Sequence, residues 1–290
     1  MTGPAPQFRA AIAAVRPDLA TQPMQLHDRG WDSNAVEVAG WIFKFPKRPE
    51  AVDRLRLEAR ILALVRPRVP LAVPELILHE IPTLFSEHRM IPGSIIETRD
   101  YDALTEPQKQ AMAERLAGFY AALHAIPAAE AVAIGVGPKP GWPPAETGLP
   151  ALRERLPADF HDYARRAFTA YDALPPEDEV FGYFDGHGWN MAFDHERGVL
   201  NGVYDFADAG IGPLSRDFTY SNLTSDDLTS RLVAAYNRET GRAVDLRTVA
   251  IRTAVQTLSE LAEADGDYEL FLSGALRWYD LTQARPQTRI

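Results

Sequence analysis

The chain has 290 residues, 46% of them hydrophobic, which is enough to bury a large core in one two-lobed domain or two small domains. A formal net charge of −10 argues against a general nucleic-acid binder, because affinity for the phosphate backbone depends on Lys and Arg displacing counterions, but it allows a cationic substrate. The absence of cysteine excludes disulfides, thiolate metal sites and redox chemistry of the chain's own.

Neither a targeting segment nor a membrane span is visible in the sequence. The apolar run near the N-terminus, Ala10 to Val15, has six residues between two arginines and is too short for the core of a signal peptide. No stretch approaches the ~20 apolar residues that cross a bilayer. We therefore expect a cytoplasmic protein that binds neither membranes nor nucleic acid.

The N-terminal part of the chain has the pattern of a small antiparallel sheet. A short helix is predicted at residues 8–15, and strands are predicted at 24–29, 34–38, 41–45, 74–80 and 83–91. The last strand ends at Pro92-Gly93, a pair that stops a strand and permits a sharp change of direction. We place the hinge between two lobes there, which gives lobes of residues 1–93 and 94–290.

Lys44 interrupts an apolar strand, where a lone ammonium group would be costly unless it were paired. The next segment, residues 49–65, has a proline near its start and apolar positions at helical spacing. At about 100° per residue, Glu58 falls in the same sector as Leu55 and Leu62, so its carboxylate faces inward. The sequence therefore predicts a Lys44–Glu58 ion pair, and the alternative is a snorkelling lysine beside a surface glutamate.

Beyond residue 93 the pattern becomes helical. Thr105 and Gln108 form a capping box, and the apolar face of the helix that follows extends to Ile126. His124, near the end of this helix, is expected to be a packing residue without a catalytic role. The segment 131–147 is rich in Gly and Pro and predicts a long surface loop. Further helical segments are predicted at 149–174, with an interruption near Pro157, and at 228–240, 246–264 and 268–281.

The segment from Val180 to Gly212 carries the clearest chemistry. Asp185 follows an apolar strand, Asn190 comes five positions later, and Asp205 comes fifteen positions after Asn190, with a hairpin predicted between the last two. Carboxylate and amide oxygens are ligands that Mg²⁺ prefers, and a separate carboxylate can orient a hydroxyl and take its proton. The spacing indicates phosphoryl transfer, with Asn190 and Asp205 as metal ligands and Asp185 as the base.

A second interpretation of the same segment is a metal site. Asp185-Gly186-His187-Gly188 resembles the Asp-x-His-Gly box of binuclear metallophosphoesterases. That site needs several histidines further along the chain, and only His195 follows His187. The number of available ligands therefore disfavours this interpretation.

The ordered residues resemble the catalytic loop and metal-binding segment of the aminoglycoside phosphotransferase and choline kinase group, small-molecule kinases with a protein-kinase-like fold. The usual pattern is His-Gly-Asp, four residues, Asn, then a strand and Asp-Phe or Asp-Trp. Here it reads Tyr183-Phe184-Asp185, four residues, Asn190 and then Asp205-Phe206. Tyr183-Phe184 departs from His-Gly, which bears on the geometry of the loop more than on its chemistry. Downstream, Asp217 resembles the residue that braces the catalytic loop in this family.

The resemblance implies a two-lobe α+β fold, with a small antiparallel-sheet N-lobe and a larger, mainly helical C-lobe. It implies that Lys44 contacts the phosphates of ATP or GTP and that Glu58 orients Lys44. Further nucleotide contacts are implied for Ser33 and Asn34, in a phosphate-covering loop, and for the backbone of Arg89, Met90 and Ile91 at the hinge. A plain hairpin turn at the first place and an ordinary strand end at the second remain open as alternatives.

The predicted function is transfer of the terminal phosphoryl group of a nucleoside triphosphate to a hydroxyl of a small molecule, with Mg²⁺ as cofactor. The expected acceptor is aminoglycoside-like or another amino-alcohol or sugar. The alternative is a nucleotide-binding pseudokinase that acts through a protein partner, an interpretation that draws on Tyr183-Phe184 and on the single glycine in residues 30–34. An acidic cluster favours a cationic acceptor, although a solvated helix end explains it more simply: Glu260, Glu263, Asp265, Asp267 and Glu269.

Overall fold

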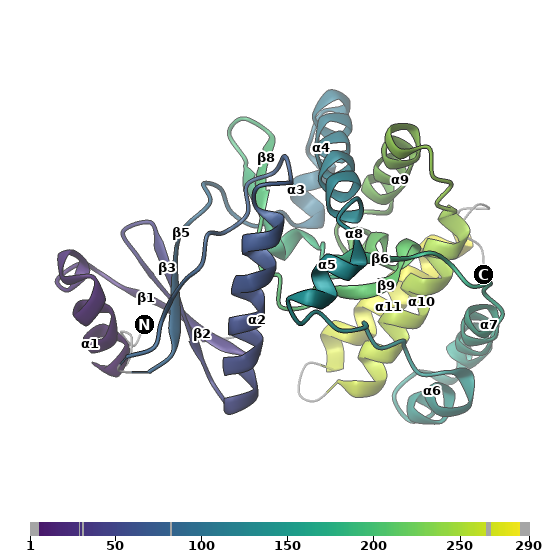
Figure 1. Cartoon of the computed structure of the whole chain (residues 1–290). Coiled ribbons are helices and arrows are strands. Elements are labelled where there is room, and N and C mark those ends of the chain that lie inside the picture. Colours follow the sequence, from purple (N-terminus) through teal and green to yellow (C-terminus); the bar gives the residue numbers. More distant parts are fainter. Residues whose placement is uncertain (1–5, 29, 31, 82, 265–267, 285–290) are drawn as a thin grey trace.

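The computed structural model describes residues 6–28, 30, 32–81, 83–264 and 268–284. In this part of the chain, a small antiparallel sheet with two helices lies beside a larger, mainly helical body (Figure 1). The predicted two-lobe α+β fold is therefore confirmed. Among the described residues, no helix is long and apolar enough to cross a membrane.

The N-lobe sheet has five antiparallel strands in the order β1-β2-β3-β5-β4. They are β1 (Gln25–His27), β2 (Ser33–Val38), β3 (Trp41–Pro46), β4 (Ile77–His79) and β5 (Phe85–Arg89). All five predicted strands are present. The last two are shorter than the predicted ranges 74–80 and 83–91.

The register of these strands gives the sheet two chemically different faces. Phe43 and Phe45 of β3 lie with Phe85 of β5 on one face, where α1 (Pro6–Val15) covers them in a hydrophobic core. The intervening residues face the other side, because successive side chains of a strand alternate. Lys44 and its cross-strand partner Ser86 therefore lie on the face turned toward the C-lobe (Figure 1).

Helix α2 (Pro49–Val65) lies between this second face and the C-lobe (Figure 1). Proline is well placed in its first turn, where the missing N–H has no partner to lose. Leu55, Ile61 and Leu62 are buried, and Glu58 is buried with them. The inward position of Glu58 that the helical periodicity predicted is therefore confirmed.

The C-lobe is built on two helix-rich cores. One centres on the packing of α4 (Glu106–His124) against α9 (Asp226–Thr240), and the second unites α6 (Ala145–Leu152), α7 (His161–Asp172), α10 (Leu246–Glu263) and α11 (Tyr268–Ala284). The smaller helices are α3 (Thr98–Asp102), α5 (Ala128–Ala133) and α8 (Ser221–Thr224). The loop predicted at 131–147 is shorter than expected, because α5 and α6 take its two ends.

Four short strands between these helices carry the segment that contains Asp185, Asn190 and Asp205. Strands β6 (Glu179–Gly182) and β9 (Gly210–Pro213) pair antiparallel, and β7 (Met191–Asp194) and β8 (Val199–Val203) form the predicted hairpin. The chain that leaves β5 runs against this hairpin. Ser94 exchanges two backbone hydrogen bonds with Phe193, of 2.8 and 3.0 Å. Gly93 has a φ of 128° and lies so close that a Cβ atom there would come within 2.8 Å of the Phe193 backbone. The division into lobes at residue 93 remains a prediction.

Candidate active site

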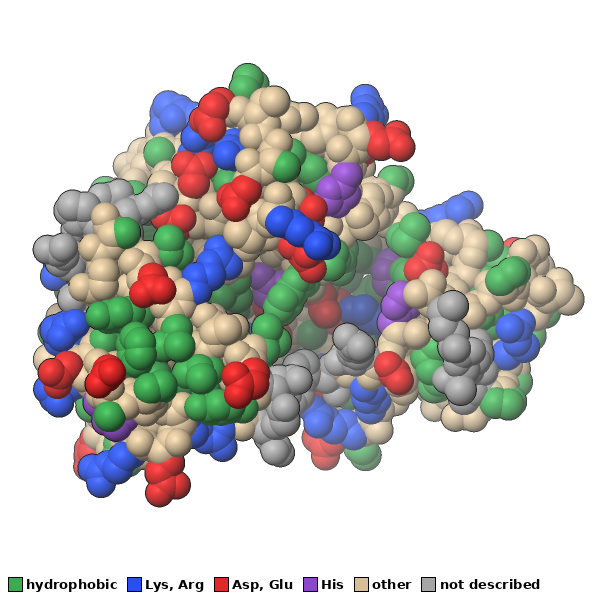
Figure 2. Space-filling model, turned by 180° about the vertical axis from the view of Figure 1, so that it is seen from behind, with side chains coloured by type: hydrophobic (Ala, Val, Ile, Leu, Met, Phe, Trp, Pro, Cys, Tyr) green, Lys and Arg blue, Asp and Glu red, His purple; other side chains and the backbone are tan. Residues whose placement is uncertain are grey.

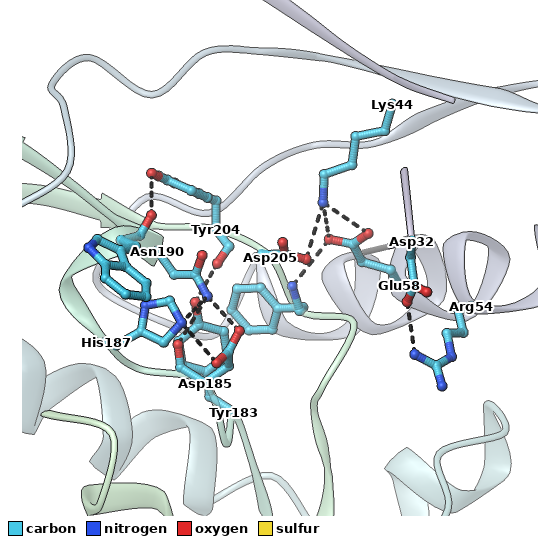
Figure 3. A network of polar contacts seen from close by, with 12 residues as sticks. Asp32, Lys44, Arg54, Glu58, Tyr183, Asp185, His187, Asn190, Tyr204 and Asp205 are labelled. Atoms are coloured by element: carbon cyan, nitrogen blue, oxygen red, sulfur yellow. Dashed lines mark hydrogen bonds and ion pairs between the residues drawn. The ribbon is translucent and has the colours of Figure 1, made fainter. Parts of the chain in front are cut away.

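Asp185 and Asn190 lie on one short loop at the base of the hairpin (Figure 3). The Asn190 side-chain nitrogen Nδ2 donates to Asp185 Oδ2 at 2.6 Å and to the Asp185 backbone oxygen at 3.1 Å. Burial raises the pKa of Asp185, and the hydrogen bond from His187 offsets part of that shift. A more basic carboxylate, with 21% of its side chain still exposed, is suited to receive a proton from a bound hydroxyl.

His187 is a direct neighbour of Asp185, although the sequence pointed to it only as part of the disfavoured metal box. Its Nε2 atom lies 3.1 Å from Asp185 Oδ1, so both oxygens of that carboxylate have a partner within the loop. Burial lowers the pKa of His187, but the interactions with Asp185 outweigh it and leave the pKa raised. No group of three or more metal-ligating His, Cys, Asp or Glu side chains occurs within the described residues. The Asp-x-His-Gly segment thus forms a hydrogen-bonded pair there.

The loop is braced from below by Asp217, as the resemblance implied. This fully buried carboxylate accepts hydrogen bonds from the backbone N–H groups of Tyr183, at 2.8 Å, and Phe184, at 2.5 Å. His124 of α4 lies with its Nε2 3.0 Å from Asp217 Oδ2 and its Nδ1 2.9 Å from the Tyr236 hydroxyl. His124 packs in the core, as predicted. It also fixes Asp217, which in turn fixes the backbone just before Asp185. A histidine has two ring nitrogens that can each form a hydrogen bond, and this property could have predicted polar partners for His124.

We expect Asp217→Asn to lower the free energy of unfolding by about 3 kcal/mol, because an amide cannot accept from the three N–H groups that now surround a carboxylate. Denaturant unfolding followed by circular dichroism measures this difference. The matched control is Asp245→Asn, which keeps a good N-cap residue at the exposed start of α10 and should change stability by less than about 0.5 kcal/mol. Equal stability of the two variants would contradict the bracing role.

Tyr183 replaces the usual histidine of the family pattern and is also fully buried. Its ring packs against Phe206, with centroids 4.7 Å apart, and against Phe119, at 6.0 Å. Its hydroxyl donates to the backbone oxygen of Tyr204, the residue immediately before Asp205. Tyr183 therefore connects the loop of Asp185 with the segment of Asp205. Although tyrosine replaces the usual histidine here, the loop is still supported by this side chain.

The predicted Lys44–Glu58 ion pair is present, and Asp205 completes it (Figure 3). Lys44 Nζ lies 3.1 Å from Glu58 Oε1 and 3.3 Å from Asp205 Oδ1. Burial alone would lower the pKa of Lys44, but the two carboxylates outweigh it and raise the pKa. Lys44 in turn holds the pKa of Asp205 below its usual value. Burial raises the pKa of Glu58, and Lys44 offsets part of that shift. Lys44 and Asp205 are therefore expected to be charged at neutral pH.

Glu58 also fixes the backbone beyond Asp205. Its Oε1 atom accepts a hydrogen bond from the Phe206 N–H at 3.1 Å. Asp205 has a φ of 65°, a conformation that few residues other than glycine adopt. One glutamate thus positions both the lysine and the strained turn that presents Asp205.

The oxygens of Asn190 and Asp205 suit a divalent cation. Asn190 uses its nitrogen to donate to Asp185, which leaves its amide oxygen free to act as a ligand. Asp205 uses Oδ1 toward Lys44, and 44% of its side chain is exposed, which leaves the other oxygen accessible. Mg²⁺ characteristically takes one or two protein oxygens and completes its shell with water and phosphate. These residues fit that pattern.

The N-lobe residues predicted to meet the phosphates do not all face the same way. Ser33 pairs with Pro46 and shares the face of Lys44, whereas Asn34 pairs with Phe45 and lies on the opposite face. The turn before them is held by Asp32, whose carboxylate accepts from Arg48 and from Arg54 of α2 at 2.7 and 2.8 Å. Any contribution of Asn34 to phosphate binding would therefore have to come from its backbone.

The three residues predicted at the hinge, Arg89, Met90 and Ile91, differ in whether their polar groups are already engaged within the chain. The Arg89 guanidinium lies 4.7 Å from the centre of the Trp41 ring, and the Met90 N–H donates to the Gly40 oxygen at 3.0 Å. The Ile91 N–H has no acceptor among the described residues. Of Met90 and Ile91, Ile91 is therefore the residue whose backbone N–H is free.

On the C-lobe side, Glu260 approaches the catalytic loop. Its charge raises the pKa of His187, and burial raises the pKa of Glu260 itself, although a 3.0 Å hydrogen bond from Gln256 offsets part of that shift. Glu263 and Glu269 are exposed, while Asp265 and Asp267 of the predicted acidic cluster lie outside the described residues. Of this cluster, Glu260 is the member that the structure brings near Asp185.

The site opens into the space between the lobes. Seen from behind, the surface is hollowed there, with acidic and basic side chains visible inside (Figure 2). Lys44 and Glu58 reach this hollow from the N-lobe, and Asp185, Asn190 and Asp205 reach it from the C-lobe (Figure 3).

Comparison with known proteins gives a consistent result. The model of the phosphotransferase enzyme family matches residues 24–283. The GDP complex of wild-type aminoglycoside 2'-phosphotransferase-IIIa is similar to this chain at 22% identity and a TM-score of 0.78, covering 96% of this chain and 98% of that one. A search of curated proteins finds no match.

Two further solved structures are similar. Macrolide 2'-phosphotransferase MphH from Brachybacterium faecium has 19% identity and a TM-score of 0.68, over 93% of this chain and 98% of that one. The streptomycin–ATP complex of APH(2")-IIa has 16% identity and a TM-score of 0.67, over 97% of each chain. At these identities the likeness shows the fold, and nothing in it favours the pseudokinase alternative.

Proposed function

The chain belongs to the phosphotransferase enzyme family, and from this premise we propose that it moves the terminal phosphoryl group of a nucleoside triphosphate to a hydroxyl of a small molecule. One observation carries the proposal. Lys44 and Asp205, 161 positions apart in the sequence, meet beside the buried Glu58 in one charged cluster that faces the Asp185–Asn190 loop. An ion-pair cluster that only stabilised the fold would have no use for the free amide oxygen of Asn190 and the exposed carboxylate of Asp205.

The N-lobe charges would hold the donor. Lys44 offers an ammonium group to the phosphate oxygens, and Glu58 fixes its position through hydrogen bonds of 3.1 and 3.3 Å. Asn190 and Asp205 would hold Mg²⁺, which supplies positive charge beside the phosphates when bound. The free N–H of Ile91 is the proposed contact for the base, and Ser33 is the proposed side-chain contact for phosphate.

Asp185 would act on the acceptor. Its carboxylate accepts a hydrogen bond from the hydroxyl and takes the proton as the acceptor oxygen bonds to phosphorus. The bond from phosphorus to the bridging oxygen breaks, and the nucleoside diphosphate leaves with that electron pair. Asn190 and His187 keep the carboxylate oriented throughout.

We propose an acceptor that carries amino groups as well as hydroxyls. Asp185 and Glu260 lie near one another on the acceptor side, and each raises the pKa of groups around it, so the local field is negative. Among the similar structures are complexes with kanamycin and streptomycin, which makes amino-sugars sensible first candidates. A cytoplasmic location, where nucleoside triphosphates are available, is part of this proposal.

We expect Asp205→Asn to weaken Mg²⁺-dependent nucleotide binding by about 10-fold or more, because it removes one charge from the proposed metal site without removing bulk. Titration calorimetry with and without Mg²⁺ measures the effect. The matched control is Glu196→Gln, which removes an exposed charge from the turn of the same hairpin and should leave binding unchanged.

The same titrations test the function itself. An Asp205→Asn variant whose nucleotide binding depends on Mg²⁺ as strongly as that of wild type would place the metal away from Asp205. A wild-type chain that binds no nucleotide at all would end the proposal of a nucleotide-dependent phosphotransferase.

A further inference from the structure

Within the described residues, strand β5 carries three buried polar side chains with an atom that lacks a hydrogen-bond partner: Ser86, Glu87 and His88. Glu87 lies on the face of Phe43, near Arg16 and His79, whereas Ser86 and His88 share the other face. Ser86 is 0% exposed and His88 is 6% exposed. Within the described residues, the Ser86 hydroxyl and His88 Nδ1 are both unpaired. Leaving such a group unpaired costs about 1–3 kcal/mol, so the partly accessible His88 on this face favours a partner supplied from outside the folded chain.

Their position on the sheet shows where that partner would be. Ser86 is the cross-strand partner of Lys44, and His88 is the partner of Ile42, so His88 shares the face on which Lys44 meets Glu58 and Asp205. The charges of Lys44 and Asp205 both act on the pKa of His88, as expected for groups on this side of the sheet. Three residues further along, the chain reaches the predicted hinge and the free N–H of Ile91. His88 therefore lies between the proposed phosphate contact and the proposed base contact.

The chemistry of His88 excludes one kind of partner and suits another. Burial and the nearby Lys44 lower the pKa of His88 to about 3, so the ring is neutral at physiological pH. A neutral imidazole beside a lysine is a poor ligand for phosphate. It has one donor nitrogen and one acceptor nitrogen, the combination that pairs with the polar edge of an uncharged heterocycle.

We propose that His88 hydrogen-bonds the polar edge of the purine base of the phosphoryl donor. The inference rests on the proposed function, since it needs a nucleotide in the cleft, and it names a residue that selects the base. The ring can donate to the 6-oxo group of guanine or accept from the 6-amino group of adenine. A buried polar group that is paired only by the right ligand discriminates strongly against ligands that leave it unpaired.

The test measures binding, so it needs no knowledge of the acceptor. Wild type, His88→Phe and His88→Gln are titrated calorimetrically with Mg-ATP, Mg-GTP and Mg-tripolyphosphate, which lacks the base. We expect His88→Phe to bind at least one purine nucleotide about 10-fold more weakly and tripolyphosphate unchanged. His88→Gln, which keeps a donor and an acceptor, should stay within about threefold of wild type.

The control variant is His79→Phe. His79 stacks on Phe85 on the opposite face of the sheet, at a centroid distance of 4.9 Å, so the same substitution there should leave purine affinity unchanged. Thermal melts of every variant confirm that it is folded.

The outcomes separate the possible explanations. Purine affinity equal to wild type in His88→Phe would overturn the proposal and leave nucleotide binding intact, with a buried water as the partner of His88. An equal loss for tripolyphosphate and purine nucleotides would also overturn it, since the residue would then only support the sheet. A wild-type chain that binds tripolyphosphate but no nucleotide would overturn it together with the proposed function.

Discussion

Asp185→Asn should bind Mg-nucleotide with nearly normal affinity and transfer phosphoryl groups about 100- to 10,000-fold more slowly. General-base contributions have that size and correspond to about 3 to 5 kcal/mol of transition-state stabilisation. The nucleotide contacts of Lys44 and the metal oxygens of Asn190 and Asp205 are unchanged by the substitution. The substitution removes the carboxylate of Asp185. Burial raises the pKa of this group, and its two oxygens contact Asn190 and His187.

Two paired measurements check this expectation: nucleotide affinity by titration, and the transfer rate with an accepted substrate. Glu196→Gln, an exposed acid-to-amide change on the neighbouring hairpin, should match wild type in both. Undiminished turnover in Asp185→Asn would remove the base role from Asp185 and leave the rest of the site as described.

Lys44→Ala should lower kcat/KM by about 100-fold or more. The change removes the ammonium group that faces the phosphates and leaves Glu58 and Asp205 as neighbouring carboxylates without their shared cation. Glu58 has only 4% of its side chain exposed, so the unpaired charge would stay buried. Initial rates over a range of nucleotide concentrations measure the loss.

The ion pair makes a sharper prediction in a double-mutant cycle. Glu58→Ala should be damaging alone and add much less in the Lys44→Ala background, because either change already disrupts the same unit. The control is the surface pair of Arg66 and Glu75, 2.8 Å apart and well exposed, for which each change and their combination should be nearly silent. Fully additive losses for Lys44 and Glu58 would count against their acting together.

The Lys44–Glu58 pair was predictable because both residues break a local pattern. Lys44 interrupts an apolar strand, Glu58 falls on the buried side of a helix, and only fourteen positions separate them. The third member, Asp205, was predicted as a metal ligand but not as a partner of Lys44. Its approach depends on how the two lobes pack, which no pattern within one segment expresses.

The residues that support the Asp185 loop also have partners that local sequence patterns could not predict. Asp217 was found only through the family resemblance, since a buried aspartate looks like any other in a sequence. His124 and Tyr183 were recognised as positions of interest, but their partners, Tyr236 and the Tyr204 carbonyl, belong to distant segments. Short-range periodicity identifies which side chains are buried, and hydrogen-bond partners across the fold require the packed structure.

Strand register supplied two results that sequence alone did not. The alternation within β2 could be read from the sequence, but which of Ser33 and Asn34 faces Lys44 follows only from the pairing of β2 with β3. The same reasoning applies to His88, whose neighbours along the strand give no sign that its ring is buried and unpaired.

The central claim is that this chain phosphorylates a hydroxyl with Asp185 as base, and one measurement tests it most directly. Wild type and Asp185→Asn are incubated with Mg²⁺, with ATP or GTP labelled in the terminal phosphate, and with a panel of aminoglycosides, macrolides, amino-alcohols and sugars. We expect labelled phosphate on at least one acceptor with wild type, and about 100-fold less or lower with Asp185→Asn. A wild-type protein that binds the labelled nucleotide and phosphorylates no member of the panel would contradict the assignment.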